Sequence, residues 1–209
     1  MIDLTHKLGE EISVYPGTAQ PNITQTNNIE EHGYALISMH IGTHTGTHID
    51  APCHIVPGKR SLDQYPIDFF IGSAYVLDCT DRSEITKELL EKHATEIAES
   101  EFLLFYAGWH HKWNTEAYFD AYPVLNEEAC QYLLNFNLKA VGFDSISADP
   151  VGCMEIANHK FLLGNDILIM ENLNNLEKLN GKKFELNCIP LLIKDSDGST
   201  VRVFARNIK

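Results

Sequence analysis

The stretch "HTGTHIDAPCH", residues 44–54, places three histidines and an aspartate within eleven positions. A polar surface loop can have this composition. A metal site can also have it, because neutral imidazoles and a carboxylate form the mixed ligand set that zinc or manganese accepts. Read with the period of two of an extended chain, His44, His48 and Asp50 share one face, and the other face is apolar or β-branched. The pattern therefore favours extended chain with candidate metal ligands on one side.

The spacing of the first two histidines requires a bend in this chain. Four extended residues separate the Cα atoms of His44 and His48 by about 13 Å, which is too far for parallel side chains to share one ion. A helix would bring the two residues together, but Gly42, Gly46 and Pro52 disfavour a helix here. We therefore expect a turn at Gly46, because glycine permits such a bend and leaves room for a metal.

Composition and charge limit what the stretch can belong to. The 209 residues are 44% hydrophobic and 22% charged, and no repeat or linker-like run divides them, so we expect one domain over residues 1–209. The formal net charge of −13 argues against nucleic-acid or anionic-membrane partners, which require basic patches. The sequence shows no signal peptide or membrane span, which predicts a cytoplasmic protein. The five cysteines are scattered and are expected to be reduced thiols.

The chain divides into a β-rich N-terminal third and a remainder in which strands and helices alternate. Apolar or β-branched runs predict strands at residues 22–29, 34–42, 73–80, 102–108, 138–144 and 166–171. Helices are predicted at residues 85–98 with Ser83 as cap, at 115–122, at 127–136 with Asn126 as cap, and at 154–163 before Gly164. Residues 184–194 and 200–206 predict a hairpin that turns at Asp197-Gly198. The alternation indicates an α/β fold.

The opening stretch closely resembles the motif of the cyclase family, metal-dependent hydrolases that include the bacterial kynurenine formamidases and the isatin hydrolases. The family pattern His-x-Gly-Thr-His-x-Asp-x-Pro-x-His stands at residues 44–54 without a mismatch. "YPG" at 15–17, "GFDSISADP" at 142–150 and "HKFLLGNDILIMENL" at 159–173 are similar to further family landmarks in the same order. The resemblance implies the swivelling β/β/α fold of the family in a single domain, and a homo-oligomer, either a dimer or a tetramer.

Two residues far along the chain are further candidate ligands. Glu171 ends the apolar run "ILIM", where an ionised carboxylate needs a cation or several donors unless it reaches water. His159 lies on the apolar side of its predicted helix, where a histidine can be a core residue or a ligand. The twelve-residue step between them matches the second metal pair of the family. The resemblance implies one ion on His44, His48 and Asp50, and a second ion on His159 and Glu171. Zn²⁺ is expected, with Mn²⁺ as an alternative, and with one or two ions per chain.

The last histidine of the motif has a different implied role. The resemblance makes His54 a proton shuttle beside a metal that activates water and polarises a carbonyl. The implied activity is hydrolysis of a linear or cyclic amide, with aryl formamides such as N-formylkynurenine as the leading class. Tyr15 matches an aromatic position of the family's substrate pocket, although the formamidases usually carry tryptophan there, and it could instead belong to a Tyr-Pro-Gly turn. His110 and His111 follow the strand predicted at 102–108, and could either face the site or lie in a solvated loop, and the pattern assigns no role to His40.

Two other functions use some of the same residues. The run His48-Ile49-Asp50 with a distal His159 is also the pattern of two histidines and one carboxylate found in non-haem iron oxygenases. That interpretation leaves His44, His54 and Glu171 without roles. A noncatalytic metal-binding module would keep the ligands and leave His54 idle or make it an ordinary ligand.

Overall fold

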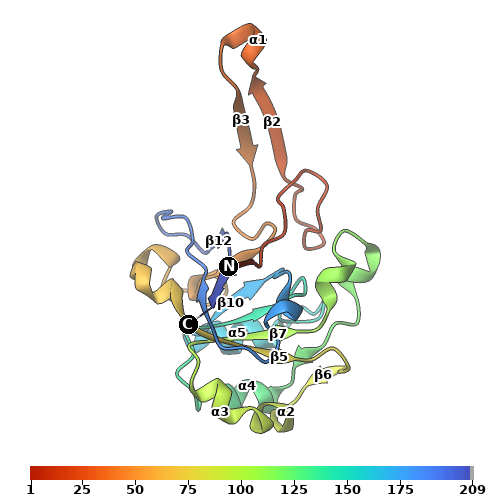
Figure 1. The fold of residues 1–209 in the computed structure, drawn as a ribbon, viewed down its shortest axis with the longest axis vertical. Helices are drawn as coiled ribbons and strands as arrows, with labels where there is room; N and C mark the ends of the chain where they lie inside the picture. Colours follow the sequence, from red (N-terminus) through yellow and green to blue (C-terminus); the bar gives the residue numbers. More distant parts are fainter. Residues whose placement is uncertain (208–209) are drawn as a thin grey trace.

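Short apolar strands form a nine-stranded mixed sheet in the computed structural model, which describes residues 1–207 (Figure 1). In order across the sheet, the strands are β1 (Ile2–Asp3), β13 (Phe204–Asn207), β11 (Phe184–Asn187), β5 (Ile71–Asp78), β7 (Phe102–Tyr106), β9 (Ala140–Phe143), β10 (Leu168–Glu171), β4 (His48–Asp50) and β12 (Gly198–Thr200). The central strands β5, β7, β9 and β10 are parallel, and their outer neighbours are antiparallel. This sheet, with helices against it, confirms the predicted α/β fold.

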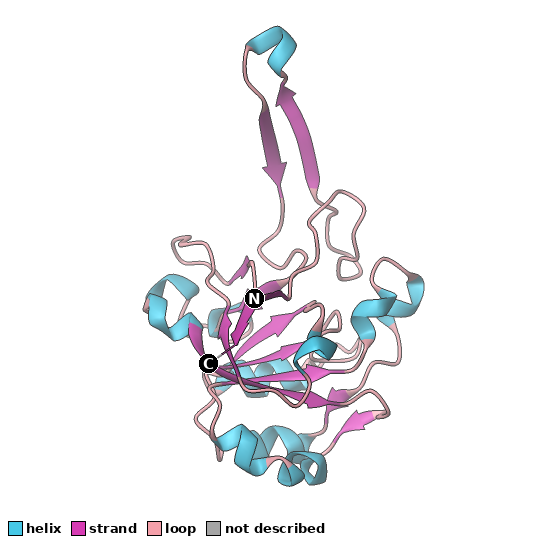
Figure 2. Ribbon diagram, in the orientation of Figure 1, coloured by secondary structure: helices cyan, strands magenta, loops and turns pink. Residues whose placement is uncertain are grey.

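Alternation along the central strands gives the sheet two apolar faces. In β7, Phe102 and Leu104 point to one face, whereas Leu103 and Phe105 point to the other. Four helices cover the second face (Figure 2): α2 (Lys87–Lys92), α3 (Ala94–Ala98), α4 (Glu127–Leu133) and α5 (Ala157–Gly164). Loops and short 3-10 turns cover the first face. The turns on this face are η1 (Pro52–His54), η2 (Leu62–Gln64), η3 (Ile67–Phe70) and η6 (Leu176–Leu179), whereas η4 (Trp109–Lys112) and η5 (Glu116–Phe119) pack in a separate small cluster around Tyr118.

The helix predicted over residues 85–98 is divided and begins later than expected. Ser83 does not cap it, because Ile85 is fully buried in the short strand β6 (Glu84–Ile85), which pairs with β8 (Val124–Leu125). Thr86 is the cap of α2, and its side chain accepts a hydrogen bond from the backbone N–H of Leu89. At His93 the backbone leaves the helical region, with φ −116° and ψ 19°, and α3 starts after it.

The other predicted helices differ in extent. Asn126 caps α4 as predicted, accepting from the backbone N–H of Ala129 at 2.9 Å. The helix predicted at 115–122 is wrong, since only the 3-10 turn η5 forms there. α5 begins at Ala157, three residues later than predicted, because Ile156 adopts a left-handed φ of 41°. Within residues 1–207, no helix is both long and apolar enough to cross a membrane.

The predicted C-terminal hairpin is correct in its outer strands and wrong in its turn. β11 and β13 pair antiparallel as expected. Asp197-Gly198 does not join them, because β12 leaves this pair and hydrogen-bonds to β4 at the opposite edge of the sheet. This exchange carries Asp197 to the histidine-rich stretch.

The two predicted N-terminal strands form a hairpin that projects from the body of the molecule (Figure 1). We call it the arm: β2 (Asn22–Asn27), α1 (Ile29–His32) and β3 (Leu36–His40). All of β3 is exposed, and the chain is not in a strand between His40 and the start of β4 at His48. The turn expected at Gly46 is confirmed by its φ of 66°.

Candidate metal centre

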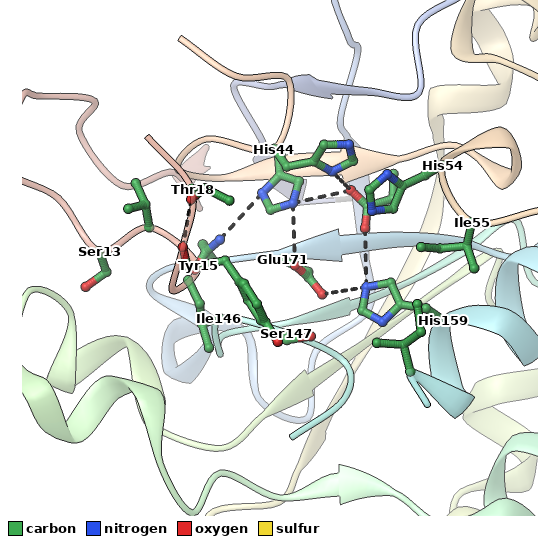
Figure 3. Close-up of a pocket in the computed structure, with 15 residues that line it drawn as sticks. Ser13, Tyr15, Thr18, His44, His54, Ile55, Ile146, Ser147, His159 and Glu171 are labelled. Carbon is green, nitrogen blue, oxygen red and sulfur yellow. Dashed lines mark hydrogen bonds and ion pairs between the residues drawn. The ribbon is translucent and has the colours of Figure 1, made fainter. Parts of the chain in front are cut away.

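Three chain segments meet where the candidate ligands lie (Figure 3). β4 and β10 are antiparallel neighbours, and their register places His48 opposite Glu171. The turn at Gly46 brings His44 back over β4, so that the ring centroids of His44 and His48 are 5.2 Å apart. His159 approaches from α5. The structure therefore brings together all five residues that the sequence suggested as ligands.

The first group of possible ligand atoms is formed by His44, His48 and Asp50, whose atoms all lie within 4.8 Å of one another. Nδ1 of His44 is 2.6 Å from Oδ1 of Asp50, and Nε2 of His48 is 3.3 Å from the same oxygen. His48 and Asp50 are buried, with exposed fractions of 3% and 1%. This donor set matches the predicted first ion site.

The second group shares Asp50 with the first. Nε2 of His159 is 3.6 Å from Oδ2 of Asp50 and 3.2 Å from Oε1 of Glu171. The other oxygen of Glu171, Oε2, is 3.4 Å from Nε2 of His48. Each carboxylate thus presents one oxygen to each group, which is the arrangement expected of bridging ligands.

The remaining ring nitrogen of each ligand histidine faces a hydrogen-bond acceptor. The pairs are His44 Nε2 with Asp197 Oδ2 at 3.0 Å, His48 Nδ1 with the carbonyl oxygen of Gly46 at 2.8 Å, and His159 Nδ1 with Asp149 Oδ2 at 2.6 Å. Metal-binding histidines usually donate their second N–H in this way, which fixes the ring and its tautomer. The residues present therefore fit a divalent cation.

In the buried cluster, the imidazoles and the carboxylates stabilise each other's charged forms. Burial opposes protonation of His48, but the carboxylates of Asp50 and Glu171 outweigh burial and raise the pKa of His48 to about 10. Burial also opposes ionisation of Asp50 and Glu171, yet the adjacent imidazoles hold the pKa of both carboxyls below the usual values. Protons on the imidazoles thus neutralise the carboxylates, and a cation binding here must displace them.

His54 lies beside the ligand cluster. It belongs to η1, and its ring centroid is 3.9 Å from that of His44 and 6.4 Å from that of His159. Burial, together with the neighbouring imidazoles, lowers the pKa of His54 despite the nearby carboxylates. A neutral imidazole at neutral pH can accept a proton and return it.

These residues line a cavity of about 280 Å³. Tyr15, Thr18 and Ile146 form the wall facing the histidines (Figure 3). The hydroxyl oxygen of Tyr15 accepts from the backbone N–H of Gly152 at 3.2 Å, and its carbonyl oxygen accepts from the Thr18 hydroxyl at 2.7 Å. Tyr15 is thus held at the cavity wall, where the sequence placed it.

The three histidines without an assigned role lie outside this cavity. His40 is exposed on the arm, and His111 is exposed in η4. His110 is buried, and its Nδ1 lies 3.0 Å from a carboxylate oxygen of Asp144. Asp144 also accepts from the backbone N–H of Ala107, so this pair belongs to the folded framework.

Three residues of the site were missed by the sequence reasoning. Asp197 had only the signal of a turn residue, and Asp149 lay in a segment noted as a family landmark without a role. Asn172, with a left-handed φ of 57°, is 1% exposed and donates from Nδ2 to the carbonyl oxygen of Gly46 at 2.9 Å. Asp197 and Asn172 lie more than a hundred residues from the partners they support, so no local pattern indicates them.

Comparisons with known proteins identify the family of the chain. The chain matches the family model Cyclase over residues 2–150. It is 32% identical over 209 residues to a kynurenine formamidase of Bacillus thuringiensis (strain Al Hakam), covering 99% of this chain and 97% of that protein. Its structure matches isatin hydrolase A from Labrenzia aggregata with a TM-score of 0.89 and 26% identity, covering 100% of this chain and 93% of the other. It matches a protein from Bacillus stearothermophilus, described as a predicted metal-dependent hydrolase, with a TM-score of 0.75 and 26% identity, covering 97% and 96%. These matches confirm the resemblance found in the sequence, and the chain belongs to the cyclase family.

Proposed function

We propose that this protein is a metal-dependent hydrolase that cleaves a carbon–nitrogen bond in a small linear or cyclic amide, with aryl formamides as the leading substrate class. The observation that carries the proposal is the pair of ligand groups sharing Asp50, with His54 beside them in one cavity. The kynurenine formamidase and isatin hydrolase relatives support this choice of bond.

The donor set favours zinc, with manganese as the alternative. His44, His48 and Asp50 would hold one ion, and His159 and Glu171, with Asp50, a second. A bound cation would supply a water whose pKa falls to about 7 and would polarise the substrate carbonyl. We propose one or two ions per chain, since the two groups can fill separately.

The residues of the chain then have distinct tasks. His54, neutral at neutral pH, accepts a proton and passes it to the leaving nitrogen, which cannot depart as an anion. Tyr15 and Ile146 form an apolar wall against which a flat aryl group can pack, with stacking on Tyr15 worth about 1 kcal/mol. The small cavity limits the substrate to a compact molecule.

The site contains more than the alternative functions require. An iron oxygenase with His48, Asp50 and His159 as ligands would have no use for Glu171, yet both oxygens of this carboxylate face the cluster. A noncatalytic module would not require His54 beside the ligands. The hydrolase accounts for all of these residues.

An assay of a substrate panel tests this function directly. Metal-loaded protein is expected to hydrolyse at least one of N-formylkynurenine, isatin and simple aryl formamides, with or without oxygen. Adding a chelator should abolish the activity and adding back zinc or manganese should restore it, because the residues alone supply no activated water. Carboxylate release and substrate oxidation are followed together. Turnover that requires oxygen would favour the oxygenase, and no turnover of any amide or ester would favour the noncatalytic module.

We also propose that the protein is a homo-oligomer, assembled through the arm. Ile23 faces Met39 and Gln25 faces Ile37 across the hairpin, so the apolar residues share one face. Ile37 and Met39 are 60% and 59% exposed. An isolated two-stranded hairpin is marginally stable in water, so this apolar face requires a cover. Between residues 20 and 43 only Glu30 and Glu31 carry formal charge. Most of the net charge of −13 therefore lies outside the arm, and repulsion between two arms is weak.

The arm is tested by charging each of its faces in turn. Ile37→Asp combined with Met39→Asp is expected to convert a dimer or tetramer into a monomer, as measured by sedimentation velocity. The matched control is Ser38→Asp with His40→Asp, which places the same substitutions at the same spacing on the other face of β3. A monomeric wild type, or an apolar-face variant that assembles as the wild type does, would contradict this proposal.

A cytoplasmic location is part of the proposal. All five cysteines lie within the described residues, and they are free thiols. Burial raises the pKa of the Cys130 thiol to about 12, which suppresses its reactivity. Unpaired thiols are typical of proteins from reducing compartments.

A further inference from the structure

Asp197 is brought to the candidate metal centre by an exchange of strands. It directly precedes β12, which leaves the C-terminal segment to pair with β4, and Gly198 then lies opposite Asp50. A Cβ atom at Gly198 would lie 2.6 Å from Cε1 of His44. Glycine therefore allows the backbone of β12 to approach the His44 ring, and Asp197 follows it.

The carboxylate of Asp197 is held from two sides. The backbone carbonyl oxygen of Asp197 accepts a hydrogen bond from the N–H of Ala51 at 2.8 Å. In the side chain, Oδ1 accepts a hydrogen bond from the hydroxyl of Thr43 at 3.0 Å. These bonds leave Oδ2 directed at two imidazoles, 3.0 Å from Nε2 of His44 and 3.4 Å from Nδ1 of His54. One oxygen thus faces both a proposed ligand and the proposed proton carrier.

Each contact has a separate consequence. His44 presents Nδ1 to Asp50, so an acceptor at Nε2 fixes the tautomer in which Nδ1 carries the free lone pair. The contact with His54 is longer: at 3.4 Å, an ion-pair distance, Oδ2 lies on the Nδ1 side of the ring and leaves Nε2 available for proton transfer. The two ring centroids lie 3.9 Å apart, and Oδ2 of Asp197 is near one nitrogen of each ring.

We propose that Asp197 is a positioning residue that orients the imidazoles of His44 and His54 for metal binding and for proton transfer. This inference rests on the proposed metal-dependent hydrolase function. His44, His54 and Asp197 could also form a ligand group of their own. The side chain of Asp197 is 45% exposed, whereas that of Asp50 is 1% exposed. Oδ2 of Asp197 faces Nε2 of His44, and Oδ1 of Asp50 faces Nδ1 on the other side of the same ring. These features favour an acceptor over a ligand.

The test compares Asp197→Ala and Asp197→Asn with the wild type. Asp195→Asn is the matched control, because Asp195 lies in the same loop, its side chain is 74% exposed, and asparagine tolerates its left-handed φ of 55°. Zinc affinity is measured by competition with a chromophoric chelator, in the absence of substrate. At saturating zinc, kcat and KM are measured with the most active amide of the substrate panel, and thermal unfolding checks that each variant folds.

Asp197→Ala is expected to bind zinc about 10- to 100-fold more weakly, with unchanged stoichiometry. At saturating zinc its kcat should fall while KM stays within about threefold of the wild-type value. Asp197→Asn keeps one acceptor oxygen and should recover part of both losses. Zinc affinity and kcat equal to those of Asp195→Asn would overturn the inference, as would the loss of one whole ion at saturation, which would make Asp197 a ligand. A wild type that binds neither zinc nor manganese would overturn the proposed function, and the inference with it.

Discussion

Asp50→Ala is expected to remove most of the zinc or manganese from protein purified without chelator. Asp50 is the residue that both ligand groups contain, with Oδ1 near His44 and His48 and Oδ2 near His159. Its loss also leaves three imidazoles facing each other without the carboxylate that attracts their protons or a cation. Because a bound cation would supply the activated water and stabilise the developing charge, we expect kcat/KM to fall by at least about 10³-fold, or about 4 kcal/mol.

Elemental analysis of wild type and variant measures this effect directly. Asp78→Ala is a suitable control, since Asp78 is an exposed carboxylate at the end of β5 and does not line the cavity. Asp50→Asn separates charge from packing, because it retains the volume and one oxygen at this position. Equal metal content in wild type and in Asp50→Ala would show that the ligands have been assigned wrongly.

The sequence predicted most of this site because its central part is local. His44, His48, Asp50 and His54 lie within eleven residues, so the alternation of the chain and one glycine determine how they face each other. The bend at Gly46 could be predicted because extended residues would hold His44 and His48 too far apart to share an ion, and glycine is the residue between them that permits a turn. The apolar run before Glu171 placed that carboxylate at the end of a strand, where β10 in fact ends.

The parts that the sequence did not predict depend on tertiary pairing. Asp197-Gly198 has the composition of a hairpin turn, but the residues after it pair with β4, more than a hundred positions earlier in the chain, and no local pattern indicates this pairing. The helix start at residue 85 was wrong for a similar reason, because burial of Ile85 beside β8 outweighs local helix propensity. Asn172 supports Gly46 through a contact between residues 126 positions apart.

Electrostatics connects the fold with the proposed chemistry. The cluster buries Asp50 and Glu171 at the junction of β4 and β10, where ionised carboxylates require compensating charge. The imidazoles compensate them with protons, as the raised pKa of His48 shows, and the same nitrogens are the ligand atoms of the two groups. Protons and cation therefore compete for one set of sites. His54 is outside this competition, since its pKa is lowered and its ring lies beside the cluster.

His54→Ala is therefore expected to separate catalysis from metal binding. If His54 carries a proton and is not an essential ligand, the variant should retain much of its metal while kcat falls by roughly 10² to 10⁴, or about 3 to 5 kcal/mol of barrier. Added imidazole should restore part of the rate, because the cavity left beside His44 can admit a soluble base. His40→Ala is the control, since His40 is an exposed histidine on the arm and should leave both quantities unchanged. Metal content and kcat are measured on the same preparations. Loss of metal in proportion to loss of activity would place His54 among the ligands, and an unchanged kcat would remove it from the reaction.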